Sequence, residues 1–195
     1  MAKIYSFVKN PRLSQYLQTY RPFLMFLGKF FLTYIVLTLV YQFYLSQSTD
    51  AANDVDGFTR AVASQSEWLT DLFGTDAALA PHDSQPAVKF LFNNEYVARI
   101  IEGCNALSVM ILFIAFIIAF SGRVRTTILF IIAGCVIIHI LNISRIALLA
   151  AAIYHYPEYE NFLHGVIFPL IIYSTVFLLW VIWVNKYSTY ASKSN

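Results

Sequence analysis

The stretch TTILFIIAGCVIIHILNISRIALLAAA, Thr126–Ala152, decides the fold class of this chain. It is apolar apart from a few positions, of which His139, Asn142 and Arg145 are the most polar. About 20 predominantly apolar residues in a helix cross the roughly 30 Å hydrocarbon core of a bilayer. The stretch is longer than that and therefore predicts a membrane-spanning helix.

Three further apolar runs occupy residues 23–45, 104–121 and 166–184. Hydrophobic residues make up 58% of the chain and charged residues only 12%, whereas soluble domains carry about 25% charged residues. We therefore predict one all-α integral membrane domain over residues 1–195, with four transmembrane helices at about 23–45, 104–121, 126–152 and 166–184.

The polar residues 46–103 form the one large region outside these runs. Within it, the spacing of Phe58, Val62, Leu69 and Leu72 predicts an amphipathic helix that can lie on a membrane. Asn93-Asn94 separates two short apolar segments, and asparagine tolerates the left-handed backbone of tight turns. We therefore also expect a β-hairpin shortly before Cys104.

The charges separate along the chain. Lysine and arginine near helix ends favour the cytoplasm, and a four-helix path puts most of them on one side: Lys3, Lys9, Arg12, Arg21, Lys29, Arg123, Arg125, Lys186 and Lys193. The same path puts every acid on the other side: Asp50, Asp54, Asp56, Glu67, Asp71, Asp76, Asp83, Glu95, Glu102, Glu158 and Glu160. We therefore predict that both termini are cytoplasmic and that residues 46–103 are extracytoplasmic.

Several function classes lack a motif in this sequence. It contains no GxxxxGK[ST], GxGxxG, HExxH, CxxC or GxSxG pattern, so phosphate-loop nucleotide binding and zinc-protease chemistry have no support. Its 2 cysteines cannot build a disulfide framework. No Cys/His cluster has ligand spacing, so we expect no metal, no organic cofactor and no nucleic-acid partner.

Three chemically useful side chains are predicted at one depth, on three different helices. Cys104 would open the second helix at the outer face, Arg145 lies about 28 Å along the third helix by helical rise, and His164 precedes the fourth. A helix N-terminus and cationic neighbours favour the reactive thiolate form of a cysteine. These residues suit a nucleophile (Cys104), a general acid/base (His164) and a group that stabilises the oxyanion (Arg145).

Structural interpretations of the same residues stay open. A cysteine at a helix start is commonly a small buried residue, Arg145 can reach for lipid headgroups, and His164 can be an interfacial histidine. His139, Asn142 and Arg145 share a helix face, which we interpret as a buried hydrogen-bonded stripe that supports Arg145. Cys135 lies deeper in the membrane and is expected to serve packing.

The segments EGCNALSVMILFIAFIIAF, LNISRIALLAAAIY and NFLHGVIFPLIIYS (residues 102–120, 141–154 and 161–174) resemble the exosortase/archaeosortase family of membrane-embedded, sortase-like cysteine transpeptidases and proteases. The short four-helix layout is similar to the exosortase F type of Bacteroidetes. The resemblance covers a catalytic core of about residues 96–184. By motif context it implies Cys104, Arg145 and His164 as the family's catalytic cysteine, arginine and histidine.

The chain departs from many exosortases after the cysteine, where Asn105-Ala106 replaces Ser-Gly. We take Asn105, with Asn142 and His139, as supporting residues of the predicted site. The resemblance further implies secreted protein substrates with a C-terminal sorting signal, which consists of a short motif, a transmembrane helix and a basic cluster. Cleavage would occur on the periplasmic side of the inner membrane, through an acyl-enzyme that water or an amine resolves.

Two other function classes remain open at this point. The chain could be a non-enzymatic assembly or transport factor for envelope polymers, in which Arg145 and His164 line a polar cavity. It could also be a membrane anchor for a partner. Neither role needs a cysteine beside two cationic groups, so the surroundings of Cys104 distinguish these classes from an enzyme. The sequence does not fix the oligomeric state.

Overall fold

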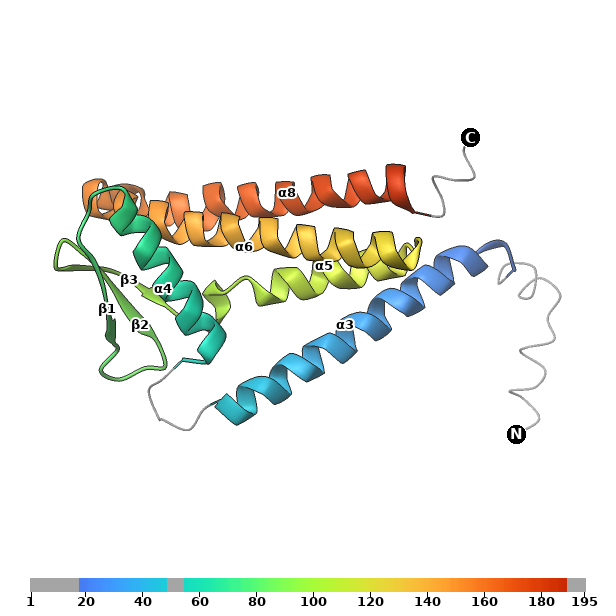
Figure 1. Ribbon diagram of the computed structural model, residues 1–195, viewed down its shortest axis with the longest axis horizontal. Coiled ribbons are helices and arrows are strands. Elements are labelled where there is room, and N and C mark those ends of the chain that lie inside the picture. Colours follow the sequence, from blue (N-terminus) through green and yellow to red (C-terminus); the bar gives the residue numbers. More distant parts are fainter. Residues whose placement is uncertain (1–17, 49–54, 189–195) are drawn as a thin grey trace.

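The computed structural model describes residues 18–48 and 55–188 (Figure 1). The predicted cytoplasmic charges Lys3, Lys9, Arg12 and Lys193, and the predicted outer acids Asp50 and Asp54, lie outside these ranges. The described chain forms, in order, helices and strands with these bounds: α3 (Arg21–Ser48), α4 (Gly57–Leu72), β1 (Ala77–Pro81), β2 (Val88–Phe92), β3 (Glu95–Ile100), η1 (Glu102–Cys104), α5 (Leu107–Ala119), α6 (Val124–His155), η2 (Pro157–Tyr159), α7 (Glu160–Phe162), η3 (Leu163–Ile167), α8 (Phe168–Ile182) and η4 (Trp183–Tyr187).

Three helical segments are long and apolar enough to cross a membrane, namely Arg21–Gln47, Val124–His155 and Pro157–Tyr187. The chain is accordingly a multi-pass membrane protein. Helix α5 has 13 residues, which is about 20 Å at 1.5 Å per residue and less than the hydrocarbon thickness. A fourth crossing through α5 therefore remains a prediction.

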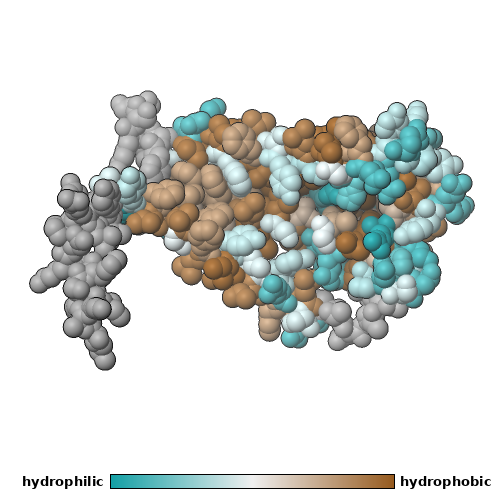
Figure 2. Space-filling view, turned by 180° about the vertical axis from the view of Figure 1, so that it is seen from behind, coloured by the Kyte–Doolittle hydropathy of each residue, from teal (hydrophilic) through white to brown (hydrophobic). Residues whose placement is uncertain are grey.

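The chain passes back and forth along one axis (Figure 1). The start of α3 and the end of α8 lie at one end of the molecule, and α4 and the β-sheet lie at the other. This arrangement agrees with the separation of basic and acidic residues in the sequence. Figure 2 shows apolar residues over much of the helical part and more hydrophilic residues toward the end that carries the sheet. Which side of the membrane each end meets remains a prediction.

Residues 77–100 form an antiparallel sheet of order β1-β2-β3, so the description of the chain as all-α requires a correction here. Asn93 and Asn94 lie between β2 and β3 with φ of 51° and 64°, the left-handed conformation that asparagine tolerates. Strand β1, of sequence AALAP, was not expected, because it lacks the β-branched and aromatic residues that favour strands. It pairs with β2 along its whole length.

We name residues 55–100, which comprise α4 and the sheet, the cap. Alternate residues of β2 are buried, as are Val62 and Ala63 of α4. Ile146 and Ala150 of α6 belong to the same hydrophobic core. Helix α4 therefore does not simply lie on a membrane, because one of its faces packs against the sheet and α6.

A second hydrophobic core joins α5, α6 and α8. Phe113, Ile138 and Trp183 are fully buried in it. Small residues allow membrane helices to approach closely, and Gly134 of α6 fills this role because a Cβ there would overlap the ring of Phe113. This core fixes how far α5, α6 and α8 are shifted along one another.

Candidate active site

Cys104 is the last residue of η1, a single 3₁₀ turn, and its backbone N–H donates to the Ile101 carbonyl at 2.8 Å. Its side chain is half-buried and packs against the core of the cap. The prediction that Cys104 opens a helix is wrong, because α5 begins only at Leu107. Ala106 has a φ of 62° and separates the turn from the helix.

Asn105 lies between the cysteine and α5 and is 2% exposed. Its Oδ1 accepts from the backbone N–H of Leu107 at 2.9 Å, so it satisfies the first N–H of α5. Its Nδ2 donates to the Tyr41 hydroxyl of α3 at 3.1 Å and to Thr59 Oγ1 of α4 at 3.0 Å. One buried amide therefore fastens the segment after Cys104 to three helices.

Asn142 and Arg145 approach the same segment from α6. Asn142 is fully buried, and its Nδ2 donates to the Cys104 carbonyl at 2.8 Å. Its Oδ1 accepts a long hydrogen bond from Arg145 Nη1 at 3.5 Å. The Nε of Arg145 is buried and has no hydrogen-bond partner in the described part of the chain. Asn142 thus links Arg145 to Cys104, and the buried Nε–H of Arg145 is an unused donor beside this link.

His164 lies in η3, a π-helical turn that leads into α8. Its side chain is exposed, and within residues 18–48 and 55–188 it makes no hydrogen bond. The ring of Phe130 lies 5.0 Å from that of Trp183 and 5.7 Å from that of Tyr187, so the start of α6 packs against the end of the last helical segment. His164, at the other end of that segment, therefore lies toward the end of the bundle at which α6 carries Arg145.

The structure therefore brings Cys104 and Arg145 together through Asn142, whereas in the described part of the chain no hydrogen bond joins His164 to any of the three. His139 does not support Arg145 as predicted. Its Nε2 is 2.7 Å from Gln65 Oε1, and its ring lies 5.8 Å from the ring of Phe58, so it faces α4. Of the predicted polar stripe on α6, Asn142 alone contacts the guanidinium.

Sequence reasoning missed the partners of Asn105, which are Tyr41 and Thr59, and it missed Asp56 behind Thr59. Asp56 accepts from the backbone N–H groups of Phe58 and Thr59 and caps α4. An aspartate before a helical pattern is a recognisable N-cap signal, so Asp56 could have been found. Tyr41 has no comparable signal, because it lies 64 residues before its partner in the chain.

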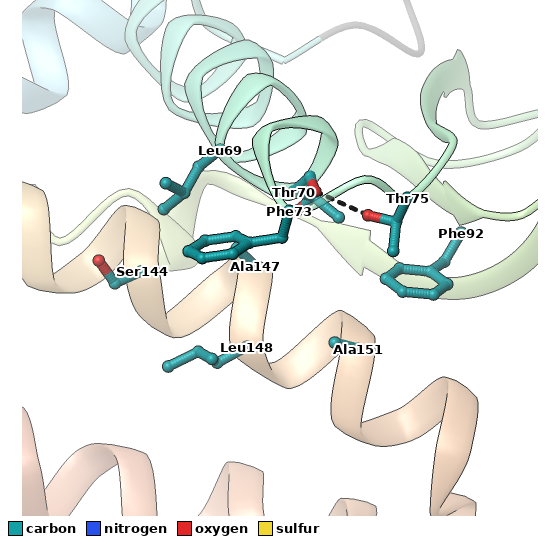
Figure 3. A pocket seen from close by; sticks show the side chains of 9 residues that line it. All are labelled: Leu69, Thr70, Phe73, Thr75, Phe92, Ser144, Ala147, Leu148 and Ala151. Atoms are coloured by element: carbon teal, nitrogen blue, oxygen red, sulfur yellow. Dashed lines mark hydrogen bonds between the residues drawn. The ribbon is translucent and has the colours of Figure 1, made fainter.

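A cavity of about 300 Å³ lies beside this site, between α4, β2 and α6 (Figure 3). Its lining is almost entirely apolar and consists of Leu69, Thr70, Phe73, Thr75, Phe92, Ser144, Ala147, Leu148 and Ala151. Ser144 adjoins Arg145, but neither Arg145 nor Cys104 lines the cavity. In the described ranges, no group of three or more His, Cys, Asp and Glu side chains could hold a metal ion.

Comparison with known proteins gives one match. The family model for transmembrane exosortases (Exosortase_EpsH) matches residues 17–183, a span that includes the cap and all the residues described above. Comparisons with the curated proteins and with the solved structures gave no match.

Proposed function

Because the chain belongs to the transmembrane exosortase family, we propose that it is a membrane-embedded cysteine peptidase or transpeptidase. Family membership supports a membrane protein that sorts or processes other proteins. We assign it secreted substrates with a C-terminal sorting signal, which it cleaves at the periplasmic face of the inner membrane. Its short helical layout favours the exosortase F type.

One observation carries this proposal, namely the shared contact of Cys104 and Arg145 with Asn142. A buried guanidinium N–H without a partner is costly, and a negative charge that develops next to it is stabilised. An attack by the Cys104 thiolate on a carbonyl would produce such a charge. A membrane anchor needs no unpaired donor at this place.

The proposed reaction has two steps. The Cys104 thiol gives its proton to His164 through a bridging water, the sulfur bonds to the carbonyl carbon of the scissile peptide, and the oxyanion that forms is stabilised by Arg145. The C–N bond then breaks, and His164 gives a proton to the departing amine. The N-terminal part of the substrate remains on Cys104 as a thioester, which water or an amine then attacks.

The place of His164 fits the second step better than the first. Its side chain is exposed, and in the described part of the chain no hydrogen bond joins it to Cys104. In the proposed complex the departing amine lies beside the imidazole, whereas the thiol, which has no hydrogen bond to His164, exchanges its proton with it through water. The π-helical turn that carries His164 is a type of turn that often occurs at functional sites.

The test is capture of the thioester. The wild type, Cys104→Ala and the control Cys135→Ala are expressed with the envelope proteins of the same cell, and adducts on the cysteines are identified by mass spectrometry. We expect the N-terminal part of a secreted protein on Cys104 in the wild type and in Cys135→Ala, and none in Cys104→Ala. Normal processing of every protein with a C-terminal helix in Cys104→Ala would refute the enzyme and favour the assembly or transport role.

A further inference from the structure

The cap is bonded to the residue that follows Cys104. Thr59 of α4 binds Asn105, and Asp56 binds Thr59 in turn. We propose that Thr59 and Asp56 are positioning residues for Cys104 that act through Asn105. The proposal rests on the proposed function in one respect, since it takes Cys104 to be the nucleophile.

The chemistry of this chain of contacts fixes its direction. A carboxylate only accepts hydrogen bonds, so the Thr59 hydroxyl must donate to Asp56 Oδ2. Thr59 Oγ1 can then only accept a further hydrogen bond, so the Asn105 group that faces it must be the Nδ2 amide donor. The Asn105 oxygen is thereby directed to the N–H of Leu107. Asp56 thus determines the orientation of an amide that it does not touch.

All three polar residues are buried. Asp56, Thr59 and Asn105 are 2%, 0% and 2% exposed. Water cannot replace a lost partner at such places, and networks in a low-dielectric interior depend on every member being satisfied. Two tyrosines of α3 complete the network. The Tyr41 hydroxyl accepts from Asn105, and the Tyr44 hydroxyl donates to Asp56 at 3.4 Å.

Cys104 is consequently held from both sides. Asn142 of α6 binds its carbonyl at 2.8 Å, and Asn105 fixes the next residue against α3 and α4. Nucleophilic attack demands close alignment, and a misplacement of about 1 Å can cost about 100-fold in rate. The network therefore gives α4 a role in the orientation of the thiol, although α4 contributes no reacting group.

The variant Thr59→Val removes the acceptor with little change in shape, and Thr59→Ser retains the hydroxyl. In Asp56→Asn, the backbone N–H groups of Phe58 and Thr59 hold Oδ1 in place, so an N–H replaces Oδ2. The Thr59 hydroxyl then faces two donors. Thr70→Val is the matched control, because Thr70 is a buried threonine of α4 whose hydroxyl bonds only to the Ser66 carbonyl of its own helix.

The measurement is the rate at which a small maleimide labels Cys104 in full-length protein that carries Cys135→Ala. We expect labelling to accelerate about fivefold or more in Thr59→Val. Loss of the buried hydrogen bond between Thr59 and Asn105 makes local opening of the segment around the half-buried thiol more frequent. Thr59→Ser and Thr70→Val should stay within about twofold of the reference. The dependence of the labelling rate on pH should change in Thr59→Val and not in Thr70→Val.

An unchanged or slower rate in Thr59→Val overturns the proposal, as does an equal acceleration in Thr70→Val, which would indicate general loosening. If Thr59→Val does not fold, Asp56→Asn decides, with acceleration in support and an unchanged rate against. Labelling needs no substrate. A failure to capture a thioester on wild-type Cys104 would therefore refute the enzyme and leave the labelling result valid.

Discussion

The substitution Asn142→Leu tests the link between α6 and Cys104. It keeps the branched outline of the side chain, although leucine is larger than asparagine, and it removes the N–H that binds the Cys104 carbonyl at 2.8 Å. Asn142 is fully buried, so the carbonyl loses its partner without gaining water, at a cost of about 1–3 kcal/mol. The Arg145 contact adds little, because at 3.5 Å it is at the limit of a hydrogen bond.

Two quantities should change together. The free energy of unfolding in detergent, measured by titration with SDS, should fall by about 1–3 kcal/mol. Hydrogen exchange at the amides of η1 should accelerate by about 5- to 150-fold, the same free energy expressed as an opening equilibrium. Asn161→Leu, at an exposed position of α7, is the control and should change neither. An Asn142→Leu protein with wild-type stability and wild-type exchange at Cys104 would refute the reasoning.

Two further predictions follow from the packing and the topology. Gly134→Ala should lower the melting temperature in detergent, since its Cβ overlaps the buried Phe113 ring and overpacking costs about 1–3 kcal/mol. Gly28→Ala, with open space around the added Cβ, should not lower it, and equal effects would contradict the packing argument. With the native cysteines replaced, Ser84→Cys should react with a membrane-impermeant thiol reagent from the periplasm, and Arg125→Cys only after the inner membrane is opened. The reverse pattern would invert the topology.

The long helices could be predicted because apolar length alone marks them. The run at residues 126–152 became α6, with a few more residues at each end. The prediction for residues 104–121 placed the helix start too early, because the Asn105 side chain bonds the N–H of Leu107 and Ala106 adopts a left-handed conformation. A hydropathy pattern reports neither a side-chain hydrogen bond nor the backbone conformation of a single residue. Strand β1 was missed because pairing with β2, and not its own composition, makes it a strand.

In the candidate site, too, the sequence could indicate some residues but not the contacts between them. Cys104 and Arg145 could be found because a thiol at the edge of a membrane and a cation within it are unusual in a sequence. Their link through Asn142 could not be found, since it joins residues 38 positions apart and depends on the register of α5 and α6. His139 was placed by helical spacing on the face of Arg145, but its partner Gln65 lies 74 positions away on α4.

The shared core of the cap has a consequence for how the protein is made. Ile146 and Ala150 complete that core from α6, yet the ribosome synthesises them well after residue 100. The cap leaves the ribosome before α6, and its apolar face toward α6 stays exposed until α6 has been inserted. The segment around Cys104 is bonded to both parts, so it reaches its final geometry only after α6 has been synthesised and inserted beside the cap.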